Sequence, residues 1–156
     1  MSDDVSPFAE PVSSLYRCND IMARNVDYVL KELRTLSLPK DLLTEIETAF
    51  RDFGSTLYDV KKEIHNLEYE LGMHPSDGSF ASPDADSDPK VTIGLIRNWV
   101  DSDAVKLDKM VRKLWAISDQ NGNQYVLAVA LVTESVKNIL QAQAYAKREL
   151  DRLALR

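Results

Sequence analysis

Apolar side chains between residues 43 and 71 recur at spacings that alternate between three and four positions without a gap. A side chain returns to the same face of an α-helix at these spacings, whereas the side chains of a β-strand change face at every residue. The pattern therefore predicts one long amphipathic helix whose apolar seam packs against other helices. The seam consists of Leu43, Ile46, Phe50, Phe53, Leu57, Val60, Ile64, Leu67 and Leu71.

Three further stretches repeat this design, and proline and glycine mark their limits. The six prolines stand at positions 7, 11, 39, 75, 83 and 89, so the intervals between them are long enough for helices. Gly122 divides the last interval, because glycine readily takes the left-handed conformation that ends a helix. We therefore expect helices at about 11–37, 40–72, 90–119 and 123–155. The other three seams comprise Val12, Leu15, Met22, Val26, Val29, Leu33 and Leu36; Ile93, Ile96, Val100, Leu107, Met110, Leu114 and Ile117; and Tyr125, Val129, Val132, Val136, Ile139, Ala146, Leu150 and Leu153.

Short connections decide which helices become neighbours. The turns at 37–39 and 120–123 are so short that each joins two helices that must fold back on one another. Two hairpins that bury their seams together give an all-α, antiparallel, up-down-up-down four-helix bundle. We expect this bundle to be a single domain that includes residues 1–156.

Residues 73–89 separate the two hairpins and have a different composition. Small, acidic and proline residues dominate this stretch, which has too few apolar side chains to order itself. The sequence therefore predicts a flexible acidic crossover. A crossover of this length leaves a second arrangement open, in which two chains exchange hairpins and form a homodimer. The apolar repeat also continues through 147–156, so the last helix is a second candidate for pairing with another chain.

Charge and cysteine content limit the functions that this chain can have. The formal net charge is −6, which disfavours nucleic acid as the main partner because phosphate binding needs a surplus of Lys and Arg. No apolar run approaches the length of a membrane span, so we expect no membrane partner. Cys18 is the only cysteine and cannot form an internal disulfide, which favours a cytoplasmic location.

The strongest argument for an anionic partner is a basic cluster in the third predicted helix. The cluster contains Lys106, Lys109, Arg112 and Lys113, and Trp115 follows it. The simpler interpretation is that these long side chains border the seam of their own helix and place their charged ends near acidic residues of a neighbouring helix.

The sequence contains no catalytic, metal or cofactor signature. Di-iron bundles need inward-facing Glu and Glu-x-x-His pairs, but His65 follows a seam residue and should be exposed, and His74 falls in the predicted crossover. The acidic run 84–88 resembles the start of a calcium loop, but Pro89 replaces the required glycine and Leu95 the required glutamate. Cys18 beside the first seam is more simply a small core residue than a nucleophile. We therefore expect no catalytic residue, no cofactor and no metal.

Polar residues interrupt three of the four seams, and their positions match. Asn19, Asp103 and Gln143 occupy places where an apolar residue is expected, and they lie at similar distances from the tight turns as Tyr58. In an antiparallel bundle these four residues reach nearly the same height. We therefore predict a buried polar layer that includes Asn19, Tyr58, Asp103 and Gln143, hydrogen-bonded to one another or to a water.

This layer has two interpretations. Its structural role would be to fix the register of the helices; its functional role would be to hold a small polar ligand or an acid–base pair based on Asp103. If Asp103 turns outward, Ala104 can take its place in the seam. Gly54, in the middle of the second predicted helix, indicates a close helix crossing or a slight kink, and a functional hinge is the alternative.

Two functions remain after these exclusions. The first is a non-enzymatic protein that acts by binding another protein, as an adaptor, a scaffold or a neutralising partner. The second is a bundle that binds a small ligand at a polar site in its core. A cavity near Asp103 and Gln143 would favour the second, whereas an exposed apolar patch would favour the first. The side chains to examine for such a patch are Tyr28, Tyr69, Tyr145, Trp99 and Trp115.

Overall fold

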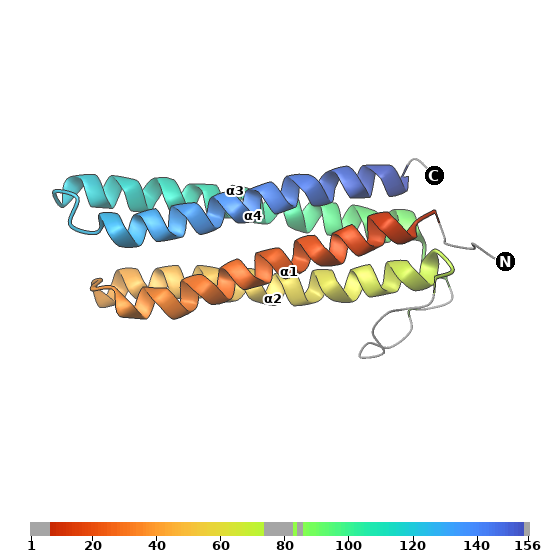
Figure 1. The fold of residues 1–156 in the computed structure, drawn as a ribbon, viewed down its shortest axis with the longest axis horizontal. Helices are drawn as coiled ribbons and strands as arrows, with labels where there is room; N and C mark the ends of the chain where they lie inside the picture. The colour runs from red at the N-terminus through yellow and green to blue at the C-terminus, as the bar shows by residue number, and fades with distance from the viewer. Residues whose placement is uncertain (1–6, 74–82, 84–85, 155–156) are drawn as a thin grey trace.

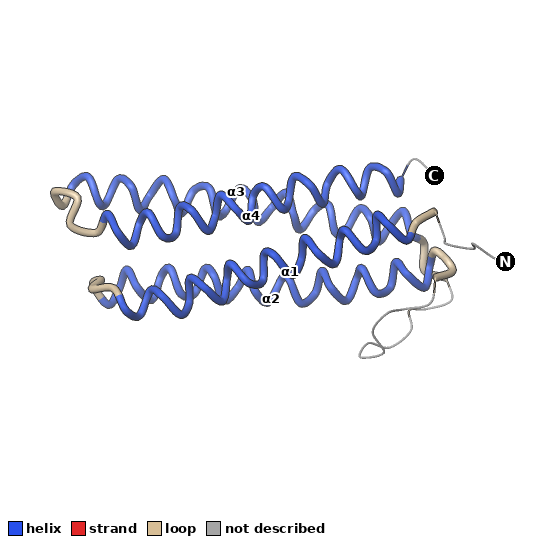
Figure 2. Tube along the Cα trace, viewed as in Figure 1, coloured by secondary structure: helices blue, strands red, loops and turns tan. Residues whose placement is uncertain are grey.

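The computed structural model describes residues 7–73, 83 and 86–154. It contains four α-helices: α1 (Ala9–Glu32), α2 (Lys40–Glu70), α3 (Pro89–Gln120) and α4 (Val126–Ala154). A short 3-10 helix, η1 (Leu33–Thr35), follows α1, and the described residues form no strand (Figure 2). The four predicted helices are confirmed. Their observed ends differ from the predicted ones by at most five residues, and the largest difference is at the end of α1, which stops at Glu32 and not at residue 37. Most of the predicted crossover lies outside the described residues.

The helices form an antiparallel four-helix bundle, as the sequence predicts. Helix α1 packs against α2 and α4, and α3 packs against the same two helices, so the order around the bundle is α1, α2, α3, α4. The α1–α2 and α3–α4 turns lie at one end, and the start of α1, the end of α2, the start of α3 and the end of α4 lie at the other (Figure 1). Each hairpin therefore runs the full length of the bundle.

Local interactions explain where the helices begin and end. Asp88 caps α3, because its Oδ1 accepts a hydrogen bond from the backbone N–H of Lys90 at 2.9 Å, and Pro89 occupies the first helical position. Gly122 and Asn123 both have left-handed backbone angles, with φ of 65° and 63°. Because Asn123 takes this conformation, α4 begins at Val126 and not at the predicted residue 123.

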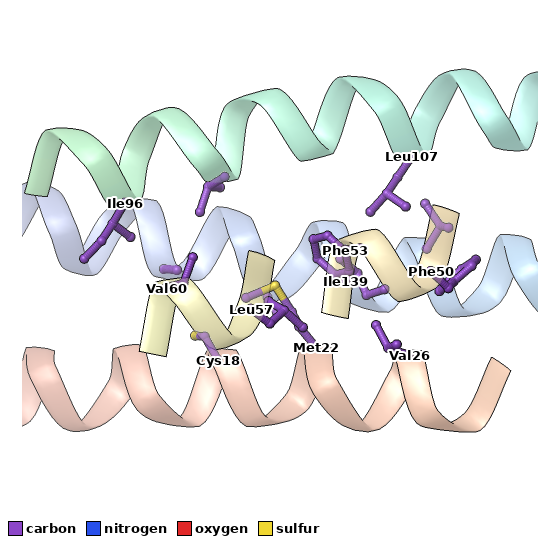
Figure 3. Close-up of a cluster of buried hydrophobic side chains, with 14 of the residues drawn as sticks. Cys18, Met22, Val26, Phe50, Phe53, Leu57, Val60, Ile96, Leu107 and Ile139 are labelled. Carbon is purple, nitrogen blue, oxygen red and sulfur yellow. The ribbon is translucent and has the colours of Figure 1, made fainter. Parts of the chain in front are cut away.

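The predicted seams form the core of the bundle. Phe50, Ile64 and Leu67 are among the largest fully buried side chains. Small shifts of the seam occur near the helix ends, where Leu42 is buried in place of the predicted Leu43. Side chains from all four helices point into the space between them (Figure 3), among them Met22 of α1, Leu57 of α2, Leu107 of α3 and Ile139 of α4.

The last helix does not project from the bundle. Leu150 and Leu153, near the end of α4, are as buried as the residues at its centre. The seam of this helix is therefore buried within the bundle over its described length, and pairing with another chain stays a prediction. The reason for the burial is that α1 extends to Ala9 and covers the end of α4. None of the helices in the described part of the chain has an apolar stretch long enough to cross a membrane.

Ion pairs connect neighbouring helices on the surface of the bundle. Lys113 of the basic cluster pairs with Glu45 of α2 at 2.5 Å, as the simpler interpretation predicts, whereas Arg112 pairs with Asp108 of its own helix at 3.0 Å. Lys147 of α4 pairs with Asp101 of α3 at 2.6 Å. Pairs of this kind contribute roughly 0 to 1 kcal/mol each when they are exposed, so the seams and not the ion pairs provide most of the stability.

Gly54 lies where α2 faces α1, but the helices do not approach closely enough to require glycine. A Cβ atom at this position would lie 3.5 Å from Cγ1 of Val26, which is an ordinary van der Waals distance. The packing of α2 against α1 therefore does not require glycine at this position, because Val26 leaves room for a methyl group.

We expect Gly54→Ala to raise the free energy of unfolding by about 1 kcal/mol, because alanine removes the conformational cost of a glycine within a helix. Urea unfolding followed by circular dichroism measures this change. Gly94→Ala is the control, since a Cβ atom at Gly94 of α3 would meet no atom within 4 Å. A destabilised Gly54→Ala variant beside a stabilised Gly94→Ala variant would show that position 54 does need glycine.

Candidate functional site

The structure separates the four residues of the predicted polar layer. Asn19 of α1 and Gln143 of α4 are buried, with 4% and 3% of their surface exposed. Tyr58 is 62% exposed and does not belong to the layer. Leu57 and Val60 occupy the seam of α2 at this height, and the residue after Leu57 is rotated by about 100° from the core. The inclusion of Tyr58 was therefore wrong, because the prediction matched height and not direction.

Asn19 of α1 and Gln143 of α4 leave unmet hydrogen-bonding capacity in the core. The side-chain oxygens Oδ1 of Asn19 and Oε1 of Gln143 are both buried and accept no hydrogen bond from any residue that the structure describes. An acceptor buried in this way costs about 1 to 3 kcal/mol. These two amides therefore lower the stability of a core whose other seam residues are mostly apolar.

Asp103 lies apart from Asn19 and Gln143, in an open groove between α2 and α3. We call this the α2/α3 groove; it has a volume of about 350 Å³ and is lined by Ala49, Asp52, Phe53, Thr56, Asp103, Lys106 and Leu107. Partial burial raises the pKa of the Asp103 carboxyl, and the nearby Lys106 ammonium acts in the opposite direction. The α3 seam passes from Val100 to Leu107, with neither Asp103 nor Ala104 fully buried between them.

The sequence pattern did not predict the burial of three ionisable residues, one histidine and two glutamates. His65 is completely buried, which corrects the prediction that it is exposed, and its ring meets the edge of Tyr69 at a centroid distance of 5.2 Å. Glu68 accepts a hydrogen bond from the hydroxyl of Tyr16. Glu149 accepts hydrogen bonds from Arg152. All three lie toward the end of the bundle that is opposite the two tight turns, at helical spacing from seam residues. A wider predicted apolar stripe would therefore have included them.

The described residues offer no metal site, and Cys18 does not have the surroundings of a nucleophile. No group of three or more His, Cys, Asp or Glu side chains in this part of the chain could hold a metal ion. Burial raises the pKa of the Cys18 thiol, and the Glu149 carboxylate raises it further. A thiol with a raised pKa stays protonated and is a weak nucleophile at neutral pH.

An apolar groove runs along the surface between α3 and α4. This α3/α4 groove consists of two adjoining hollows of about 450 and 520 Å³, which share Asp108 and Leu140. Val105 at its edge is 55% exposed, which is a large exposure for a valine. The apolar lining comprises Ala104, Val105, Val111, Val136, Leu140 and Ala144.

The charged residues that border the α3/α4 groove are mainly cations. Arg112 and Asp108 pair with each other. Lys109 and Lys137 also line the groove, and neither forms an ion pair with the described residues. The groove therefore has a positive border although the whole chain has a net charge of −6.

On the other side of α4 is a more polar hollow. This α1/α4 pocket has a volume of about 530 Å³, and its residues come from α1 and α4 only. It contains Arg17, three side-chain amides and Tyr145, which is 46% exposed. Of the aromatic residues proposed from the sequence, Tyr28, Tyr69 and Tyr145 are exposed, whereas Trp99 and Trp115 are partly buried against the core.

We expect Gln143→Met to raise the free energy of unfolding by about 1 kcal/mol, because methionine keeps the length of the side chain and removes the unpaired oxygen. Gln141→Met, at an exposed position on the same helix, should change stability by less than about 0.5 kcal/mol. Chemical unfolding measures both changes. Loss of stability in Gln143→Met would mean that the amide oxygen has a partner, such as a buried water.

The raised pKa of Asp103 predicts a pH-dependent effect on stability. Below pH 3.8, the ordinary value for this carboxyl, the group is protonated in both the folded and the unfolded chain, so it costs nothing. As the pH rises through the higher pKa of the folded state, ionisation destabilises the fold. Asp103→Asn should therefore raise the free energy of unfolding at pH 7 and change it little at pH 3. Asp59→Asn, which removes the same charge at an exposed position of α2, is the control for the change in net charge.

Comparison of the chain with protein-family models, with curated proteins and with solved structures found no match. The chemistry of the two hollows beside α4 is therefore the basis for a functional proposal.

Proposed function

We propose that this protein acts by binding another protein, and that its α3/α4 groove receives an acidic amphipathic helix of that partner. The observation that carries the proposal is an exposed apolar groove bordered by Lys109 and Lys137, which the described chain leaves without ion pairs. A groove between two helices is a common binding site for the apolar face of a third helix.

The dimensions of the groove suit a short helix. Its lining residues on α4 extend from Thr133 to Ala144, which corresponds to about 17 Å along the helix axis. A partner helix of about three turns would cover this length, with apolar side chains at positions i, i+3, i+4 and i+7 toward the groove.

The positive charges at the border of the groove indicate that the polar face of the partner helix is acidic. Carboxylates on both sides of the apolar face of an incoming helix would meet Lys109 on α3 and Lys137 on α4. A second copy of this chain fits less well, because apposing the same groove would bring these lysines against one another. Phosphate groups of a nucleic acid would also meet the lysines, but they would leave the apolar floor uncovered.

The core itself supports a small-ligand function less well. Asp103 lines an open groove with residues of α2, whereas Gln143 is buried in the seam of α4 and does not line that groove. We further propose that the protein is not an enzyme and acts in the cytoplasm, since its only cysteine is buried and its thiol has a raised pKa.

Binding of two designed peptides tests the proposal. The first is a helix of about 14 residues with leucines on one face and glutamates elsewhere, and the second has lysines in place of the glutamates. We expect saturable binding of the glutamate peptide to the full chain, measured by fluorescence anisotropy, with an affinity that falls as salt is added. Equal affinity for the two peptides, or no binding of either, would refute the proposal.

Variants locate the binding site. Reversing both charges in Lys109→Glu/Lys137→Glu should weaken binding of the glutamate peptide by about tenfold, whereas Lys31→Glu/Lys40→Glu makes the same change of net charge at exposed positions outside the groove. Ala144→Trp should block the groove, and Ala130→Trp, at an exposed position of α4 beyond its lining residues, is the matched control. Equal loss in the matched pairs would place the binding elsewhere.

A further inference from the structure

We propose that the α1/α4 pocket binds the carboxyl-terminal end of a short peptide, at a site separate from the α3/α4 groove. Arg17 would bind the terminal carboxylate, the amides of Asn25, Asn138 and Gln141 would bind the peptide groups, and Tyr145 would contact an apolar side chain. This site and the groove of the proposed function lie on opposite flanks of α4 and share only Gln141 among their described lining residues, so each can exist without the other.

The pocket has the size and the floor of a ligand site. Its volume of about 530 Å³ lies within the range of roughly 300 to 1,000 Å³ that is usual for small-ligand pockets. Cys18 of α1 and Ala142 of α4 belong to its lining and are both buried, so the hollow reaches the packed interface between the two helices. A ligand that enters it would lose water contact on the side that faces these residues.

Arg17 gives the pocket its preference for an anion. It is the one charged residue in the described lining, and it forms no ion pair with the described residues. A guanidinium presents two parallel N–H donors that match the two oxygens of a carboxylate. A carboxylate is therefore the anionic group that fits it with both oxygens paired.

The amides of the pocket match the chemistry of a peptide backbone. Asn138 of α4 donates from Nδ2 to Oδ1 of Asn25 on α1 at 3.3 Å, and Nδ2 of Asn25 donates to the backbone oxygen of Ile21 at 2.8 Å. A side-chain amide has two donor hydrogens and an acceptor oxygen, so Asn138 and Gln141 keep both kinds of hydrogen-bonding capacity. A peptide group also carries one donor and one acceptor, and it can pair with such an amide in both directions.

The rim of the pocket is apolar on both sides. Ile21 of α1 and Tyr145 of α4 both line it, and both are more exposed than is usual for side chains of their size and apolar character. Together they would cover an aliphatic side chain at the carboxyl-terminal residue of the peptide. The combination of one cation, several amides and two apolar rim residues favours a peptide carboxylate over a plain anion.

The probes for this site are the tripeptide Gly-Gly-Leu and the same tripeptide with an amidated carboxyl terminus. We expect Gly-Gly-Leu to shift the backbone amide signals of Arg17, Asn138 and Tyr145 saturably in two-dimensional NMR spectra of the full chain. The amidated tripeptide should bind about tenfold more weakly, because it lacks the charge that Arg17 recognises. Equal shifts with the two tripeptides, or no saturable shift with either, would overturn the proposal.

Two matched variants and one further probe complete the test. Arg17→Gln should weaken Gly-Gly-Leu binding by about tenfold, whereas Arg24→Gln, at an exposed position of the same helix outside the pocket, should leave it unchanged. An equal effect of both variants would refute the assigned role of Arg17. The same three residues at the carboxyl terminus of a carrier protein identify the source: binding of both forms supports a protein terminus, and binding of the free tripeptide alone supports a free oligopeptide.

Discussion

The burial of four apolar seams against one another is the interaction on which the rest of the structure depends. Each of the four helices has between 24 and 32 residues, and each has one apolar face that water would otherwise cover. Burying one Leu, Ile or Phe side chain contributes about 1.5 to 3 kcal/mol, and every seam contains several such residues. The surface ion pairs contribute much less, so the direction of each side chain relative to the seam decides its role.

This dependence explains why the architecture could be predicted from the sequence. Heptad spacing identifies the helices, and the two short turns make each consecutive pair antiparallel. The spacing does not give the exact rotation of each helix, which is why Tyr58 was placed inside and His65 outside. Toward the end of the bundle that is opposite the two tight turns, the buried stripe of α2 is wide enough to include His65 and Glu68. Asp103 shows the same limit, since it borders a groove between α2 and α3 and does not enter the core.

The two proposed binding sites could not be predicted in this way. Each is a hollow formed by residues of two helices, and the heptad pattern describes only the side of a helix that faces the core. One signal was present in the sequence: α4 has exposed small or uncharged residues at positions 141 and 144, where a surface helix usually has charges. Sequence spacing cannot show that Lys109 of α3 and Lys137 of α4 border one groove, because their positions depend on how the two helices pack.

The packing of α4 gives both sites a rigid wall. Buried residues occur along this helix from Ala128 to Leu153, so its outer face is held in place over its whole length. A partner that binds to a surface already fixed in this way loses little free energy to ordering the site. Asn19 and Gln143 oppose this stability in the core, because their side-chain oxygens are buried without a hydrogen-bond partner among the described residues. A ligand bound in the α1/α4 pocket would contact residues of both helices in the folded chain, so its binding would also stabilise the fold.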